Sequence, residues 1–219
     1  MARSVGTSLL LLILIFGASS VAHATPVDFL NFNYLANGVS VGNFYDGGSS
    51  KAPNFGVTFS SNIYGLTTTQ QGGGGNFSPD PTGSPAIFVN GTTGAPSSGW
   101  LSSNNGFSSG INFYYTAAFQ EVVTVWSGAN GTGTALATIT LSPNDASCGV
   151  VSYCNWTDVS LTFSGTAKSV TFAGPANGMG LSDITLGQGG TAIPEPSSIY
   201  LLGTGLVGMW GYWSRRLAK

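Results

Sequence analysis

The chain has 219 residues, a formal net charge of −2 and only 6% charged residues. So few Lys and Arg side chains form no basic patch that could neutralise phosphates, which excludes nucleic-acid binding. The single histidine, His23, lies in an amino-terminal segment that we expect to be removed, so a mature chain has no Ser-His-Asp or Cys-His catalysis and no histidine-bound zinc.

Residues 1–24 have the layout of a secretory signal peptide. Arg3 precedes an apolar stretch from Leu9 to Phe16, and Ala22-His23-Ala24 forms an Ala-x-Ala cleavage site. We therefore predict export through the Sec translocon and cleavage by signal peptidase after Ala24. An uncleaved amino-terminal anchor is the alternative, although the apolar core is short for one.

Residues 25–186 have the pattern of an all-β domain. Apolar residues alternate with Ser and Thr, as in half-buried antiparallel strands, and no 3.6-residue period is sustained. The predicted strands, in chain order, are Val27–Leu35, Val39–Tyr45, Phe55–Ser61, Ala86–Val89, Ile111–Thr116, Val122–Ser127, Ala137–Leu141, Val159–Phe163, Val170–Phe172 and Leu181–Leu186. This number of short strands favours one antiparallel β-sandwich, with a jelly roll as the preferred topology.

Two connections in this domain are informative. Asn130-Gly131 lies between two predicted strands and indicates a hairpin. The stretch from Leu66 to Ser84, which contains Gly72-Gly73-Gly74-Gly75, is predicted to be a long irregular loop, although it could hide a further strand. No Lys-Ser/Thr follows the four glycines, so a flexible loop is preferred over a phosphate-binding loop.

The domain offers few residues for catalysis. It contains seven acidic residues and two lysines, and Glu121 is its only glutamate. A glycosidase would need Glu121 and an aspartate to face each other across a cleft. The simpler interpretation of Glu121 is a surface-facing residue at the start of a strand, and no catalytic residue is assigned.

Cys148 and Cys154 are the only cysteines and are six positions apart. In an oxidising compartment, such a pair is most simply a disulfide that closes a small loop. Zinc is the alternative, but two thiolates without histidine partners leave zinc under-coordinated.

Aromatic side chains in polar surroundings are candidates for glycan contacts. Trp100 and Tyr153 are the two that we single out, because both lie in loop-like sequence. A β-sandwich also needs large aromatic residues in its core, where each buries roughly 150–250 Å², so packing is the competing interpretation.

The carboxyl-terminal residues have three parts. A flexible linker, residues 187–192, leads to Pro194-Glu195-Pro196, which we expect to be extended because the prolines fix φ and remove two donors. An apolar run follows, with a membrane helix predicted over about 198–213, and the basic end of residues 215–219 contains Arg215, Arg216 and Lys219. The helix is short for a hydrocarbon core of roughly 30 Å, and an ordinary helix docked on the domain is the alternative.

This order of motif, helix and basic end resembles the PEP-CTERM sorting domain, which bacterial exosortases are thought to recognise on exported proteins. The resemblance covers Ile193–Lys219 and implies an exosortase as partner. It also implies at least transient anchoring in the inner membrane with the domain in the periplasm. The protein would then reach the cell surface or the extracellular matrix.

The domain is also similar to those commonly attached to such tails. The similarity rests on Val27-Asp28-Phe29-Leu30, on residues 131–137 and on Ser182-Asp183-Ile184-Thr185-Leu186-Gly187. It implies a galactose-binding-like sandwich in which the first and last strands pair. Asp28 and Asp183 would then be the ligands of a structural calcium, since Ca²⁺ prefers oxygen ligands; two solvated acids are the alternative.

Three functions remain open. The first is a non-enzymatic structural or adhesive protein of an exopolysaccharide or biofilm layer. The second is a carbohydrate-binding, lectin-like module, with exopolysaccharide as its partner. The third and least favoured is a glycan-active enzyme that uses Glu121.

Overall fold

The computed structural model describes residues 28–68, 71–148 and 151–187 of the chain. The signal peptide, the sorting tail and residues 188–192 of the linker lie outside the described residues. The described strands are β1 (Asp28–Leu30), β2 (Val57–Phe59), β3 (Ile63–Leu66), β4 (Ala86–Val89), β5 (Pro96–Ala117), β6 (Glu121–Trp126), β7 (Ala135–Leu141), β8 (Thr157–Pro175) and β9 (Met179–Leu186). All their pairings are antiparallel, so the predicted all-β class is confirmed.

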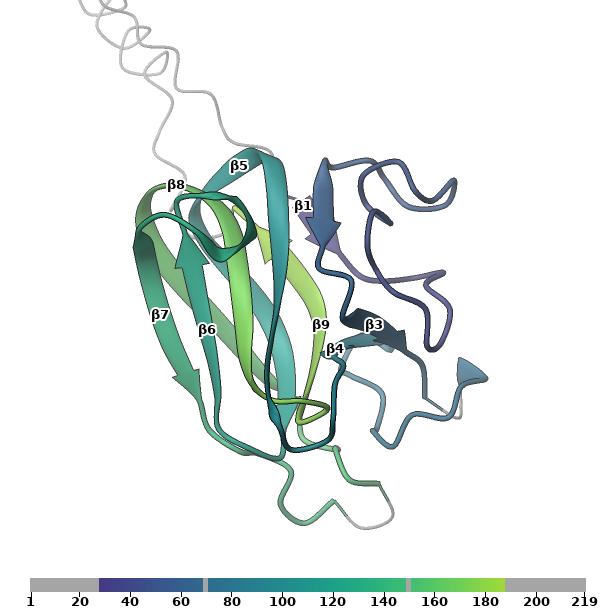
Figure 1. Cartoon of the computed structure of the whole chain (residues 1–219). Coiled ribbons are helices and arrows are strands. Elements are labelled where there is room, and N and C mark those ends of the chain that lie inside the picture. Colours follow the sequence, from purple (N-terminus) through teal and green to yellow (C-terminus); the bar gives the residue numbers. More distant parts are fainter. Residues whose placement is uncertain (1–27, 69–70, 149–150, 188–219) are drawn as a thin grey trace, which may run out of the picture. The chain divides into compact units, whose positions relative to one another are not determined.

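One continuous sheet folds into two layers. Its strand order is β3-β4-β9-β5-β8-β6-β7, with β1 paired to β9 and β2 paired to β5. Residues 96–102 of β5 pair with the carboxyl-terminal part of β8, which also pairs with β6. Residues 107–115 of β5 pair with the first part of β8, and β9 lies on their other side. The long strands β5 and β8 therefore belong to both layers (Figure 1).

The bend between the layers follows from the sequence of β5. The pairing of β5 with β8 shifts register between Ser102 and Phe107 and again between Ser108 and Gly110. Gly106 and Ser109 both have positive φ, at 71° and 75°. Irregularities of this kind bend a strand and increase its twist, so the Asn-Asn-Gly segment carries β5 around the edge of the core.

Apolar side chains from both layers form the core. Phe113 of β5 and Phe172 of β8 meet edge to face with ring centroids 6.3 Å apart, and both side chains are fully buried. Around them pack further side chains with at most 1% exposure, among them Leu101, Ile111, Val123, Val125 and Ile184. Burial of each such side chain contributes about 1.5–3 kcal/mol, which makes this core the main source of stability.

Most predicted strands are present, with different limits. Ala86–Val89 coincides with β4, and 111–116 falls within the much longer β5. The predictions 159–163 and 170–172 are parts of one strand, β8. The prediction for 39–45 is wrong, since this segment makes only the isolated bridges Ser40–Tyr64 and Tyr45–Val57. Strand β3 was not predicted, and its last residue, Leu66, begins the predicted irregular loop.

The predicted hairpin at Asn130-Gly131 connects β6 and β7. These residues belong to a short 3₁₀ turn, η3 (Ala129–Gly131), and have φ values of 55° and 73°. The backbone N–H of Asn130 donates to Ser102 Oγ at 2.8 Å, and that of Gly131 donates to Ser169 Oγ at 2.9 Å. The turn is thereby fixed to β5 and β8 near the bend.

Within the part of the chain that the structure describes, no helix has the length and apolar character needed to cross a membrane. The helix predicted over about 198–213 is not among those residues.

Candidate functional site

A pocket lies over the layer that contains β4, β9 and the end of β5. Its volume is about 310 Å³. The residues that line it come from strands and from two loops: Leu66, Asn76, Phe77, Ala86, Phe88, Thr93, Thr116, Tyr153, Asn177, Met179 and Gly180. Pockets that bind small molecules are usually about 300–1,000 Å³, so this one is at the small end of the range.

The two loops that border the pocket are hydrogen-bonded to each other. Ser78 N donates to Tyr153 O at 2.7 Å, and Ser152 N and Tyr153 N both donate to Asn76 O. The predicted disulfide between Cys148 and Cys154 is confirmed and closes the loop that carries Tyr153. The Trp156 indole N–H also donates to Ser78 O at 2.9 Å. A covalent link and several hydrogen bonds therefore fix one side of the pocket.

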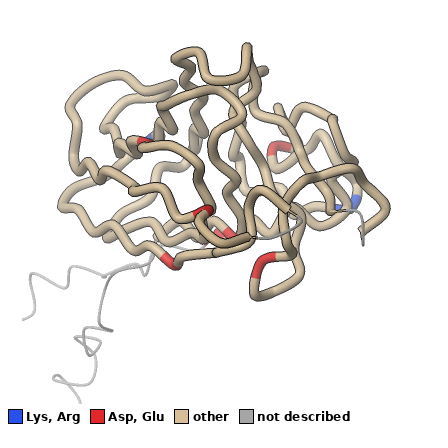
Figure 2. The backbone as a smooth tube through the Cα atoms, turned by 90° about the horizontal axis from the view of Figure 1, so that it is seen from below, with Lys and Arg blue, Asp and Glu red and all other residues tan. Residues whose placement is uncertain are grey.

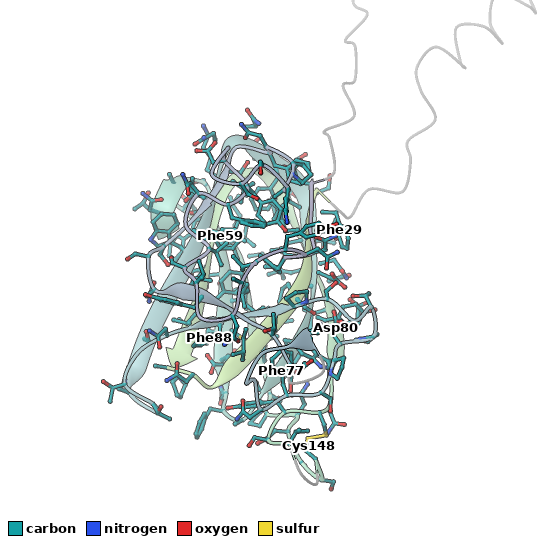
Figure 3. The ribbon with its side chains drawn as sticks, turned by 90° about the vertical axis from the view of Figure 1, so that its right-hand side faces the viewer. Phe29, Phe59, Phe77, Asp80, Phe88 and Cys148 are labelled. Atoms are coloured by element: carbon teal, nitrogen blue, oxygen red, sulfur yellow. A yellow bond between two sulfur atoms is a disulfide. The ribbon has the colours of Figure 1, made fainter. Side chains whose placement is uncertain are left out.

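Aromatic and apolar side chains supply the walls. Phe77 is almost fully buried and meets Trp156 edge to face, with ring centroids 6.0 Å apart. Phe88 of β4 is half-buried, as is Tyr153. Figure 3 shows Phe77 near Phe88, with Cys148 of the disulfide below them. A pocket with such walls suits a ligand that has apolar faces.

Two polar atoms of the pocket residues lack hydrogen-bond partners among the described residues. Thr116 Oγ1 and Asn177 Oδ1 are both buried and make no hydrogen bond. The Asn177 amide is held in place by its Nδ2 group, which donates to Gly91 O at 2.9 Å and to Thr93 Oγ1 at 3.0 Å. An unsatisfied buried polar group costs about 1–3 kcal/mol, so the pocket residues carry two polar atoms whose hydrogen-bonding capacity is unused.

The Tyr153 phenol adds a further polar group. Its hydroxyl donates to Asn177 O at 3.0 Å. Burial, followed by the nearby Asp145 and Glu121 carboxylates, raises the pKa of Tyr153, so the phenol stays protonated at neutral pH. None of the described residues that line the pocket is charged. Figure 2 shows how sparse charged residues are along the backbone.

A carboxylate cluster lies next to the pocket. Asp80 follows Phe77 by three residues, Ser182 follows Gly180 by two on β9, and the Ser182 hydroxyl donates to Asp80 Oδ2 at 2.8 Å. Figure 3 shows Asp80 beside Phe77. Asp183 meets Asp80 through Thr82, whose hydroxyl lies 3.0 Å from Asp80 Oδ2 and within hydrogen-bond distance of Asp183 Oδ2.

A bulge in β9 brings Asp183 to this position. Asn112 opposes Thr185, but Tyr114 opposes Ser182, so β9 has one extra residue at this point. Asp183 has a φ of 48°, in the left-handed region. Bulges redirect side chains, so this one changes the direction of Asp183 within a part of β9 that is buried throughout, Leu181–Leu186.

Glu121 differs from the surface residue that the sequence suggested. It is 2% exposed, its Oε1 atom has no hydrogen-bond partner within residues 28–68, 71–148 and 151–187, and burial raises its pKa to about 7. The carboxyl group lies over the backbone of β8, where a Cβ added at Gly174 would be 1.7 Å from Glu121 Oε2. The correction has a physical reason: Gly174 and Gly178 leave space for the carboxyl group inside the fold.

A glycosidase that uses Glu121 would require a second carboxyl group opposite it. Burial is the cause of the raised pKa of Glu121, with no contribution from a neighbouring aspartate. Asp80 and Asp183 do form a pair, but they contact the same hydroxyl and are only 4% and 3% exposed. A sugar cannot fit between carboxyl groups held this closely.

The other predicted site residues are separated. Tyr153 lines the pocket, whereas half-buried Trp100 lies in the first part of β5, where its backbone pairs with Ser60. Strands β1 and β9 pair as expected, with Asp28 opposite Leu186, but the residue that meets Asp183 is Asp80. Sequence reasoning missed Asp80, Thr116 and Asn177, since nothing local distinguishes them from other polar residues.

Comparisons with known proteins give only distant similarities. No family model and no curated protein matches this chain. Among solved structures, a family 29 carbohydrate-binding module is 12% identical, with a TM-score of 0.44 over 79% of this chain and 97% of that one. A family 6 carbohydrate-binding module is 13% identical, with a TM-score of 0.38 over 73% of this chain and 92% of that one. Similarity at this level assigns no binding residue here, so a function has to be inferred from the chain's own side chains.

Proposed function

We propose that this chain is an exported, non-enzymatic protein whose domain binds a neutral saccharide in the pocket beside Tyr153. The observation that supports this most is the lining of the pocket, where uncharged polar groups lie among aromatic walls. Sugars have hydroxyl groups that need hydrogen bonds and C–H faces that pack on aromatic rings.

The polar atoms match a sugar in chemistry. Asn177 Oδ1 can accept a hydrogen bond from a sugar hydroxyl, and Thr116 Oγ1 can both donate and accept. A charged ligand would find no counter-charge among the lining residues that the structure describes. The small volume suits one sugar ring, such as a chain end or a side branch, better than a long segment of polysaccharide.

The location of the protein completes the proposal. The signal peptide and the PEP-CTERM-like tail would place the domain outside the cytoplasm, where exopolysaccharide is the available saccharide. We expect sorting by an exosortase, and a structural or adhesive role in the matrix then follows from saccharide binding.

Saturation-transfer NMR on the full-length chain, with a panel of neutral mono- and disaccharides, tests the binding site. Transfer to at least one sugar is expected, and Tyr153→Ala should weaken binding about tenfold by removing an aromatic wall. Trp100→Phe is the matched control, since Trp100 is not part of the pocket lining. An equal loss of sugar binding in both variants, or no saturation transfer to any of the sugars, would contradict the assignment of the pocket as the binding site.

A further inference from the structure

Asp80 and Asp183 form a buried carboxylate pair that has no cationic partner among the described residues. Asp80 Oδ1 accepts a hydrogen bond from Ser84 N at 2.7 Å, and its Oδ2 accepts one from Ser182 Oγ at 2.8 Å. Lys51 and Lys168 are the only basic residues in the described part of the chain, and both are exposed. Lys51 lies over the Tyr34 ring instead, 5.3 Å from its centroid.

The cluster has more oxygen atoms that can accept a hydrogen bond than hydrogen atoms that can be donated to them. Thr82 Oγ1 lies within 3.2 Å of both Asp80 carboxylate oxygens, 2.9 Å from Ser84 Oγ and within hydrogen-bond distance of Asp183 Oδ2. One hydroxyl proton can serve only one of these acceptors at a time. The cluster is therefore rich in acceptors and poor in donors.

A second observation points to a missing partner. Asp183 is 3% exposed, and its Oδ1 atom is buried without a hydrogen-bond partner in the part of the chain that the structure describes. Oδ2 of the same carboxyl group contacts Thr82, so the unpartnered oxygen belongs to a carboxyl group of the cluster. Burying two carboxylates side by side is unfavourable unless a proton or a cation compensates their charge.

We propose that Asp80 and Asp183 bind one calcium ion, with the hydroxyl groups of Thr82 and Ser84 and water as further ligands. The donors are all oxygen, which suits a hard cation, and Ca²⁺ accepts irregular sets of six to eight oxygen ligands. Mg²⁺ fits less well, because it demands near-octahedral geometry and gives up its water reluctantly. Among the described residues, no third His, Cys, Asp or Glu side chain is placed to hold a metal with these two carboxylates, so hydroxyl groups and water would have to supply the other ligands.

This site has a structural consequence for the neighbouring pocket. Asp80 belongs to the segment that carries Phe77, whereas Asp183 belongs to β9, which carries Met179 and Gly180 of the pocket lining. A cation between the two carboxylates would fix that segment against the sheet. The proposed calcium site differs from the one expected from the sequence, because Asp80 takes the place of Asp28.

Calorimetric titration of the full-length, chelator-treated chain with CaCl₂ tests this proposal. We expect one ion per chain and a rise in Tm of about 5–10 °C at a Ca²⁺ concentration 100-fold above Kd. MgCl₂ should produce a smaller shift. Asp80→Asn and Asp183→Asn should each abolish the response, whereas the matched control Asp28→Asn should keep it.

The alternative is a carboxyl pair that shares a proton. In that case the wild-type chain shows no heat of binding and no change in Tm with CaCl₂, and this result would overturn the proposal. A response that survives in Asp80→Asn but disappears in Asp28→Asn would also overturn it. Both outcomes can still be interpreted if Asp183→Asn does not fold, because they depend on the wild type, Asp80→Asn and Asp28→Asn.

Discussion

Thr116 belongs to the pocket lining, and its hydroxyl group is buried without a hydrogen-bond partner among the described residues. If its role is to bond a sugar, Thr116→Val should weaken saccharide binding about five- to tenfold, the value of one hydrogen bond of about 1 kcal/mol. The same change should stabilise the free protein by about 1 kcal/mol, since it removes an unsatisfied polar group. Thermal unfolding and titration calorimetry on the same variant measure both effects. A variant that loses stability and keeps its affinity would show that Thr116 serves only packing.

Glu121 should make the stability of the protein depend on pH. Burial raises the pKa of its carboxyl group from 4.5 to about 7, so the folded state binds a proton more tightly than the unfolded state. The stabilisation from this group is therefore complete below about pH 4.5 and is lost as the pH rises to about 7. Because Asp28 and Asp183 also have raised pKa values, a variant is needed to isolate Glu121.

Glu121→Gln provides that variant. It keeps the size of the side chain and removes its titration, so it should be more stable than the wild type at pH 8 by about 1–3 kcal/mol. At pH 4.5 the two proteins should have nearly equal stability. Denaturant unfolding at the two pH values measures this difference, and parallel pH profiles would contradict the assigned burial.

At the scale of elements, the disulfide loop links stability to the pocket. Cys148 and Cys154 close a loop that contains Tyr153, and this loop pairs with Asn76 and Ser78. Replacing both cysteines by serine should cost about 2 kcal/mol of stability, the value expected for so short a loop. Saccharide affinity should also fall, because Tyr153 would lose its fixed position. Unfolding and binding measurements on the double variant check this, and unchanged affinity would show that the hydrogen bonds alone hold Tyr153.

A comparison of the predicted with the observed strands shows which kinds of strand the sequence pattern detects. The apolar residues of the sequence located β4, β6, β7 and β9, since each of these strands is short and rich in apolar side chains. The sequence pattern divided β8 in two, because Ser164-Gly165 resembles a turn, and it missed the first part of β5, where Ser, Gly and Asn dominate. Both long strands bend between the layers, and the irregular residues that permit the bend also hide the continuity of the strand.

The candidate site was harder to predict than the fold. Tyr153 and Asp183 were singled out, but their partners are far away in sequence: Asp80 is more than 100 residues from Ser182, to which it bonds. Only pairing of the strands brings these residues together. The burial of Glu121 depends in the same way on glycines of β8 and the following turn, which no local pattern connects to it.

At the scale of the whole molecule, the proposed location depends on the carboxyl-terminal residues. Deleting residues 193–219 should shift the protein from the membrane and cell-surface fractions to the periplasm or the medium. Replacing Pro194, Glu195 and Pro196 by alanine should leave the protein in the inner membrane if the motif is needed for processing. Ser197→Ala is the control. Immunoblots of cell fractions measure these shifts, and normal sorting of the triple variant would contradict recognition by an exosortase.

The central claim is that a neutral saccharide binds in the pocket. Affinity electrophoresis of the full-length chain through gels that contain the producer's own exopolysaccharide tests it most directly. We predict that the wild type and Trp100→Phe are retarded, that free neutral sugar competes with this retardation, and that Thr116→Val and Tyr153→Ala migrate faster than the wild type. Equal retardation of all four proteins, or retardation of none, would contradict the assignment of the pocket as a saccharide site.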